Sequence, residues 1–318
     1  MSAAAHGAGP SPGRARKPGP RSSSRFARVR HRSGSHEPAA AGLRGLAAVA
    51  AAVLLGLPVL SAPVPARAQG EVRTGAGSGV GAGLAQELAN PVANLISVPF
   101  QNNVDYGGGR GGALRYTLNV QPVVPFALDQ DWNLITRTIV PLQHFERVFR
   151  EHEGGLGDVV QSFFLSPSRP VNGISWGLGP VFLYPTATKD ALGGRQWGAG
   201  PTGVLLQQSG PWLYGVLANH IWSLGGVPDG RERVNATFLQ PFLAYTFPTQ
   251  TTLSLNTEST YDWSRGRWTV PVNANANQLV QIGGQAVQFG AGLRYYAERP
   301  EGGPHWGFRL TVTLVFPR

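Results

Sequence analysis

Cysteine is absent from the 318-residue sequence, and its one methionine is residue 1. Disulfides and thiolate metal sites are therefore excluded. Charged residues are scarce, at 14% of the chain, although the formal net charge is +10. The chain has 27 basic and 17 acidic residues. Residues 1–68 contain 10 of the basic and one of the acidic residues, so the rest of the chain contains 17 basic and 16 acidic residues. This near balance beyond residue 68 argues against a nucleic-acid partner, because such proteins carry their basic patch in the folded part.

Long apolar runs are also missing beyond residue 68, and the one long run lies at residues 43–60. It follows a basic region and precedes the small-residue site Ala66-Arg67-Ala68. This order predicts a basic leader and a cleaved signal peptide over residues 1–68. A retained signal anchor and an organellar transit peptide are the alternatives. Gly56 and Pro58 inside the run disfavour the anchor, and the length of the apolar core disfavours the transit peptide.

The clearest pattern in the chain is at residues 306–316, where apolar and small or polar residues alternate. Period two predicts a strand with one apolar face. That face has Trp306 at one end and Phe316 at the other, which is typical of a strand that crosses a lipid layer. A lone strand cannot lie in lipid, because its backbone polar groups must all be paired. The pattern therefore predicts a closed barrel.

Eleven more segments of strand length follow one another between turn residues. They are residues 96–106, 114–126, 132–142, 159–165, 174–184, 197–207, 212–222, 235–247, 253–263, 268–277 and 287–297.

Short turns alternate with longer, charged or Gly-rich loops, as in outer-membrane barrels with periplasmic termini. The sequence therefore predicts an all-β fold, a transmembrane antiparallel up-and-down β-barrel of about 12 strands over residues 96–318. A soluble antiparallel barrel or sandwich is the alternative. Residues 69–95 are expected to form a linker and a short periplasmic N-terminal segment, with a helix over residues 84–95 that breaks at Pro91 and lies outside the membrane.

Several charged residues fall on the polar faces of these strands. The candidate lumen-lining residues are Arg115, Arg137, Glu258, Asp262, Arg294 and Arg309, and Asp105 and Glu298 are further possible partners for the arginines. One interpretation is a lumen that selects solutes, with a slight preference for anions. The other is that arginine–carboxylate pairs brace and close the interior of a small barrel. The choice depends on strand register, which the sequence leaves open.

Catalysis has one candidate residue, His220, with Ser223 nearby. Residues three apart on a strand point to opposite faces, so the two cannot form a base–nucleophile pair without a bulge. We therefore predict that the protein is not an enzyme and that His220 is an interfacial residue beside Trp222. The run Gly107-Gly-Gly-Arg-Gly-Gly lacks the ending of a phosphate-binding loop. The His and Glu residues of the 144–153 loop are interpreted as solvated, so neither a cofactor nor a metal is predicted.

Distinctive runs extend through the chain from about Leu88. They include Leu88-Ala-Asn-Pro-Val-Ala-Asn-Leu-Ile-Ser-Val-Pro-Phe-Gln-Asn-Asn, Asp131-Trp-Asn-Leu-Ile-Thr-Arg-Thr, Trp197-Gly-Ala-Gly-Pro-Thr, Ala218-Asn-His-Ile-Trp-Ser, Asn256-Thr-Glu-Ser-Thr-Tyr-Asp-Trp and Gly302-Gly-Pro-His-Trp-Gly. The sequence resembles a family of Gram-negative outer-membrane barrels that are described as transporters or as proteins of the phenol meta-cleavage degradation pathway. It departs from many outer-membrane proteins at its end, where Pro317-Arg318 follow Phe316.

This resemblance implies a location in the cell outer membrane and the passage of small solutes, with hydrophobic or aromatic compounds as the implied class. The expected partners are outer-membrane lipids, a small-molecule solute and the barrel-insertion machinery. A non-conducting structural or binding barrel that acts through its extracellular loops is the alternative function.

Overall fold

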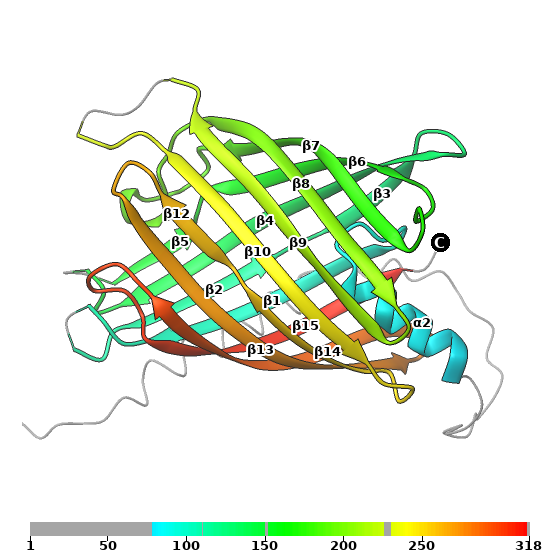
Figure 1. Cartoon of the computed structure of the whole chain (residues 1–318). Coiled ribbons are helices and arrows are strands. Elements are labelled where there is room, and N and C mark those ends of the chain that lie inside the picture. Colours follow the sequence, from blue (N-terminus) through cyan, green and yellow to red (C-terminus); the bar gives the residue numbers. More distant parts are fainter. Residues whose placement is uncertain (1–77, 110, 150–151, 226–229, 317–318) are drawn as a thin grey trace, which may run out of the picture. The chain divides into compact units, whose positions relative to one another are not determined.

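The structure is a computed structural model that describes residues 78–318, apart from residues 110, 150–151, 226–229 and 317–318. The leader and signal peptide predicted over residues 1–68, and the first part of the predicted linker, lie outside the described residues. In the described part there is one α-helix, α2 (Ser78–Ala89), and a short 3-10 helix, η1 (Asp190–Leu192). The remaining elements are strands (Figure 1).

The strands follow one another along the chain as successive neighbours. They are β1 (Ile96–Tyr106), β2 (Leu114–Val120), β3 (Val123–Ala127), β4 (Trp132–Glu146), β5 (Glu153–Leu156), β6 (Val159–Pro167), β7 (Ile174–Tyr184), β8 (Gly198–Ser209), β9 (Trp212–Ser223), β10 (Asn235–Thr246), β11 (Thr251–Thr257), β12 (Ser259–Asp262), β13 (Arg267–Ile282), β14 (Gln285–Glu298) and β15 (Trp306–Phe316).

These segments make a closed barrel, because β1 pairs with β15 and every pairing is antiparallel between neighbours. Three pairs of segments, β2 with β3, β5 with β6 and β11 with β12, each continue as one strand past a short interruption, so the barrel has twelve strands. Proline explains one interruption. Glu258, between β11 and β12, lies opposite Pro271, which accepts from the Glu258 N–H at 3.3 Å but has no N–H to donate in return. The predicted strand number and up-and-down order are confirmed.

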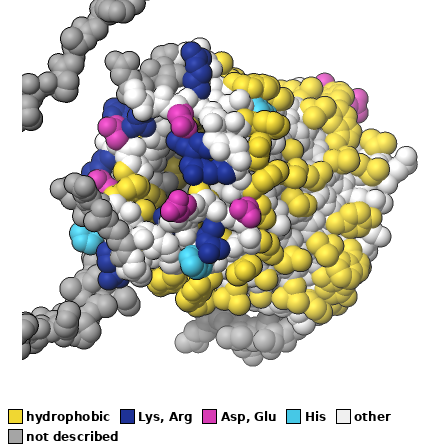
Figure 2. Space-filling view, turned by 60° about the vertical axis from the view of Figure 1, so that its left-hand side comes forward, with side chains coloured by type: hydrophobic (Ala, Val, Ile, Leu, Met, Phe, Trp, Pro, Cys, Tyr) yellow, Lys and Arg dark blue, Asp and Glu magenta, His cyan; other side chains and the backbone are white. Residues whose placement is uncertain are grey.

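The outer face of the barrel carries the apolar residues that the alternation predicted. Leu178, Leu205, Leu255, Leu293 and Leu310 are each at least half exposed. Aromatic residues stand at both ends of the strands, with Trp197, Trp222, Trp263 and Trp306 toward the longer loops and Trp212, Phe247 and Phe316 toward the short turns. Figure 2 shows apolar side chains over the wall and charged ones gathered at the hollowed loop end. This band is what a lipid-facing barrel requires.

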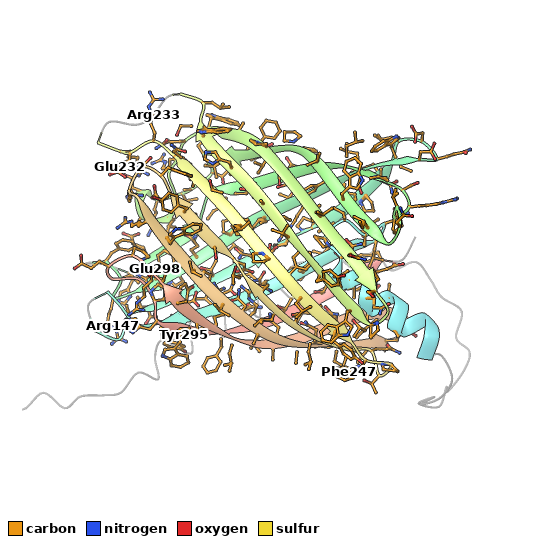
Figure 3. All side chains as sticks on the ribbon, in the orientation of Figure 1. Arg147, Glu232, Arg233, Phe247, Tyr295 and Glu298 are labelled. Atoms are coloured by element: carbon orange, nitrogen blue, oxygen red, sulfur yellow. The ribbon has the colours of Figure 1, made fainter. Side chains whose placement is uncertain are left out.

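The two ends of the barrel differ, as the loop lengths predicted. Figure 3 places Arg147, Glu232 and Glu298 at the end with the longer loops and Phe247 at the end with the short turns. Helix α2 lies at the short-turn end, where the Gln86 side-chain amide donates to the carbonyl of Gly210 at 2.9 Å (Figure 1). In the described part of the chain, no helix is both long and apolar enough to span a membrane.

Helix α2 differs from the expectation in its bounds and its contacts. It begins at Ser78 rather than near residue 84, and it ends at Ala89, before Pro91. Its side chains also enter the mouth of the barrel. Ala85 is fully buried and Leu95 almost so, in a cluster with inward-facing Leu279 and Val315. Small residues permit this close approach. We call residues 78–95 the N-terminal segment, and its buried residues fill part of the short-turn end of the lumen.

Candidate functional site

The lumen holds a cluster of paired charges, made by Asp105 on β1, Glu258 between β11 and β12, Arg294 on β14 and Arg309 on β15. We call these four residues the ion-pair cluster. Arg309 donates to both carboxylate oxygens of Glu258, at 2.9 and 2.7 Å. Arg294 lies 3.3 Å from Asp105 and 3.9 Å from Glu258. The two arginine side chains are only 8% and 7% exposed, so their charges are largely shielded from water.

Strand register explains why these residues meet. Arg309 lies opposite Asn103 on β1, and its Nε donates to the Asn103 side-chain oxygen at 2.8 Å. Arg294 donates to the same oxygen and, at 3.1 Å, to the hydroxyl of Tyr296. Asn103 is 2% exposed and thus fixes both guanidinium groups from one side.

Gly307 makes the contact between Arg294 and Asp105 possible. It lies on β15 directly between the two, opposite Asp105 on one side and opposite Arg294 on the other. A Cβ at Gly307 would overlap the Asp105 carboxylate. The missing side chain therefore lets the guanidinium reach across β15. Sequence reasoning missed this residue, although glycine on the inward face of a strand is a known sign of close approach.

The structure places the six predicted lumen-lining residues in different parts of the barrel. Glu258, Arg294 and Arg309 are together in the ion-pair cluster. Arg137 lies in the lumen on the short-turn side of the cluster, and its Nη2 donates to the side-chain oxygen of Gln121 at 2.9 Å. Among the described residues, no carboxylate lies within ion-pair distance of Arg137.

The other two predicted residues are outside the cluster. Arg115 donates to the carbonyl of Gly302, in the loop before β15, at 2.7 Å. Asp262 pairs with Arg265 at 2.9 Å, three residues further on in the same turn. Glu298, expected as a partner, is an exposed residue beyond a register shift between β13 and β14. Register and bulges decided these outcomes, and neither can be read from alternation.

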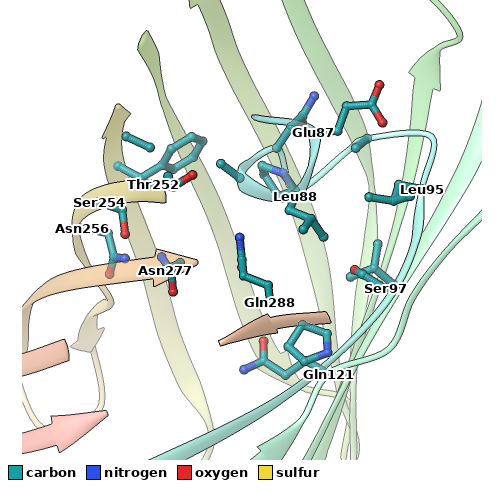
Figure 4. Close-up of a pocket in the computed structure, with 18 of the residues that line it drawn as sticks. Glu87, Leu88, Leu95, Ser97, Gln121, Thr252, Ser254, Asn256, Asn277 and Gln288 are labelled. Carbon is teal, nitrogen blue, oxygen red and sulfur yellow. The ribbon is translucent and has the colours of Figure 1, made fainter. Parts of the chain in front are cut away.

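A cavity of about 250 Å³ lies between the N-terminal segment and the ion-pair cluster. We call it the lumen cavity. Figure 4 shows Gln121, Asn256 and Gln288 around it, with Leu88 of α2 on its helix side. Arg137 also lines it. The wall formed by β9 and β10 is mostly apolar, with Leu217 and Phe242, and Gln240 is its polar residue.

A second cavity, of about 590 Å³, opens at the loop end and is lined by Gln143, Asp190, Arg231 and Asp262, among others. Along the β11–β12 strand, Asn256 lines the lumen cavity and Asp262 lines the loop-end cavity, and Glu258 lies between them. The ion-pair cluster therefore separates two spaces in one lumen. Among the described residues, no group of three or more His, Asp or Glu is placed to hold a metal ion.

The loop-end cavity is edged by ion pairs between loops. Asp190 accepts from Arg195 at 2.8 Å and also pairs with Arg231 at 2.8 Å. The hydrogen bond from Arg195 lowers the pKa of Asp190 below its ordinary value of 3.8, with Arg231 acting in the same direction. Arg231 also donates to the carbonyl of Gly193 at 2.7 Å. These contacts tie the loops after β7 and β9 to each other.

His220 lies on the outer face of β9, as the sequence predicted, with its ring centroid 4.1 Å from that of Trp222. Ser223 faces the other way and donates to Gln196 at 2.6 Å, so the candidate catalytic pair is not formed. The neighbours of His220 are instead Thr237 Oγ1, at 2.7 Å from Nδ1, and Asn235 Oδ1, at 3.0 Å from Nε2.

A hydroxyl, an imidazole and an amide in a row resemble a hydrolytic triad. However, Thr237 is paired with β9 on one side and β12 on the other, so the backbone N–H groups around it belong to the strand ladder. The Thr237 hydroxyl also accepts from the Trp263 indole at 2.8 Å, which fits an interfacial aromatic group.

Comparison with known proteins gives a structural likeness. No protein-family model matches the chain, and no curated protein sequence matches it. The crystal structure of an outer membrane channel from Pseudomonas putida F1 is similar with a TM-score of 0.54 and 16% identity, over 70% of this chain and 93% of that one.

Two further solved structures are more distant. The NanC porin has a TM-score of 0.45 and 10% identity, over 69% of this chain and 98% of that one. Outer membrane phospholipase A from Escherichia coli has a TM-score of 0.41 and 13% identity, over 76% of this chain and 98% of that one. The likeness to the Pseudomonas channel shows a shared fold, that of an outer-membrane β-barrel.

Proposed function

We propose that the protein is an outer-membrane channel or uptake protein for small solutes, and that it is not an enzyme. The observation that carries this proposal is the pair of cavities in one lumen, one toward each end of the barrel, with the ion-pair cluster between them. A charged constriction with wider spaces on both sides is how barrel channels select solutes. Outer-membrane lipids and the barrel-insertion machinery are the partners that such a role requires.

Hydrophobic or aromatic solutes are the class that we propose, following the family resemblance. In support, one side of the lumen is apolar. Leu213 and Leu217 of β9 and Val204 and Leu206 of β8 face inward and form a cluster with Val92 of the N-terminal segment. An apolar wall opposite a polar one suits solutes that have both kinds of surface.

The alternative is a non-conducting barrel that binds partners through its extracellular loops. Two observations favour it: the arginine–carboxylate pairs inside the lumen and the N-terminal segment in its mouth. Both functions share one fold, so a measurement of conduction separates them.

Single-channel recording of the purified protein in planar bilayers tests the proposal. We expect discrete conductance, with an anion preference that falls when Arg137→Ala or Arg309→Ala removes a lumen charge. Arg169→Ala, at an exposed turn position outside the lumen, is the matched control and should keep the wild-type preference. A folded protein that never conducts would refute the channel and favour the alternative, and an unchanged ion preference in both lumen variants would contradict the lining role.

A further inference from the structure

We propose that the lumen cavity is a binding site for one small monoanion with an apolar body of about one ring, held through Arg137. This inference deepens the proposed function, because it assigns a solute class to a space on the route through the barrel. It rests on the charges, the lining and the size of the cavity.

The ion-pair cluster and Arg137, taken as one group, are one anion short of charge balance. The ion-pair cluster and Arg137 together contain three guanidinium groups and two carboxylates. Arg294 and Arg309 take both carboxylates, and Arg137 has a neutral amide, that of Gln121, as its side-chain partner. Glu258 acts on Arg137 only from beyond ion-pair distance and is already paired with both arginines of the ion-pair cluster, so a bound anion would give Arg137 a counter-charge of its own. A carboxylate suits the site, because a guanidinium group donates two parallel hydrogen bonds to it.

One acid borders the cavity. Glu87 of α2 is exposed and lies at the margin of the space, on the helix side (Figure 4). It is therefore placed at the entrance, whereas Arg137 is placed on the strand wall. The anionic end of a ligand is expected at Arg137, away from Glu87.

The remaining lining suits an apolar body. Leu217 of β9 is 2% exposed and Phe242 of β10 packs against its cluster, and both line the same cavity as Arg137. Val123 of β3 and Leu88 of α2 are among the other apolar residues that line it. Gln288 and Asn256 add amides that can donate to a second oxygen. A single cation on an otherwise mixed wall selects for an amphipathic monoanion rather than for a dianion or a sugar.

The size of the cavity suits one ring. An apolar cavity of about 150 Å³ holds one benzene molecule. The lumen cavity, at about 250 Å³, has room for one ring with a carboxylate. Benzoate is therefore the probe that we choose, with benzyl alcohol as the same ring without charge and acetate as the charge without a ring.

The test is isothermal titration calorimetry of the full chain, purified in detergent from outer membranes. We expect benzoate to bind at least about ten-fold more tightly than benzyl alcohol or acetate, since a hydrogen-bonded charge contributes about that factor. Arg137→Gln should weaken benzoate binding about ten-fold or more and leave benzyl alcohol unchanged. Arg115→Gln is the matched control, because Arg115 is an inward arginine outside the cavity, and it should bind benzoate as the wild type does.

A second variant keeps the test decisive if Arg137→Gln does not fold. Leu217→Trp fills the cavity from its apolar side without changing a charge, and should abolish benzoate binding. Absence of benzoate binding to the wild type, or equal binding to Arg137→Gln or Leu217→Trp, would overturn the site. A protein that conducts without binding benzoate refutes the site and leaves the channel standing. One that binds benzoate in this way but never conducts refutes the channel and leaves the site standing.

Discussion

The pair formed by Glu258 and Arg309 offers the sharpest test of the lumen. The change is Glu258→Gln, which keeps the shape of the side chain and removes its charge. Arg309 then loses a carboxylate that it contacts at 2.7 and 2.9 Å, and Arg294 loses one at 3.9 Å. Because the arginine side chains are only 7% and 8% exposed, water cannot replace the lost partner fully.

The magnitude follows from distance and shielding. Two unit charges about 4 Å apart attract by about 4 kcal/mol at an effective dielectric constant of about 20. Removal of one partner of a buried pair costs about 3–5 kcal/mol in proteins. We therefore expect Glu258→Gln to lower the free energy of unfolding by about 3 kcal/mol or more.

A double-mutant cycle isolates the interaction. Glu258→Gln is combined with Arg309→Met and, separately, with Arg294→Met, and unfolding of the barrel by guanidinium chloride in detergent is followed by tryptophan fluorescence. The coupling energy should reach about 1.5–3 kcal/mol with Arg309 and be smaller with Arg294, which is further away. Lys189, in a loop, and Glu153, at the start of β5, form the control: they lie 3.1 Å apart with the lysine 48% exposed, and should couple by less than about 1 kcal/mol.

The cycle can fail in two ways. A coupling below about 0.5 kcal/mol with Arg309 would mean that the two charges act independently, and the ion-pair cluster would not brace the lumen. A larger coupling with Arg294 than with Arg309 would mean that Glu258 has a different partner in the folded barrel. Either result would refute the reasoning from distance.

Three further predictions concern other parts of the molecule. Ala85→Glu puts a carboxylate into a fully buried contact of the N-terminal segment and should raise conductance by releasing the segment. The control Gly83→Glu, at a position where a Cβ meets no neighbour, should leave conductance unchanged. If Ala85→Glu conducts no more than the wild type, the segment does not block the lumen. His220→Ala should leave phospholipid release at the background that the wild type shows, and activity lost with this variant would instead establish a hydrolase. The hydrogen bond from Arg195 lowers the pKa of Asp190, so the stability that this contact contributes should persist at pH 3.8 and be lost as the pH falls through the lowered pKa. Carbon-13 NMR of the Asp190 carboxyl should show this titration. Arg195→Ala should return the pKa of Asp190 toward 3.8.

The site was only partly predictable from the sequence. Alternation places Arg137, Arg294 and Arg309 on inward faces, because side-chain direction in a strand depends on position alone. Which acid meets which arginine depends on how far neighbouring strands are shifted. Thus Glu258 pairs with Arg309 from three strands away, whereas Asp262, four residues along, pairs with a turn arginine.

The N-terminal segment is a second case in which the sequence alone did not reveal a contact. Its composition, rich in Gly and Ala, predicts a weak helix and gives no sign of a partner. The partner is the barrel mouth, whose inward residues Leu279, Ala286 and Val315 come from strands that lie about 185 to 230 residues further along the chain. Contacts of that kind are absent from any local pattern.

Local order was therefore decided by the sequence alone: twelve strands, their inward and outward faces, the aromatic ends and the alternation of turns and loops. These features follow from period two and from the need to pair every backbone group in lipid. The lumen was decided only by tertiary structure. Closure of the barrel sets one shift for all strands together, and that shift brings Asn103, Gly307 and Glu258 to the same arginines while leaving Arg137 beside an amide and a cavity.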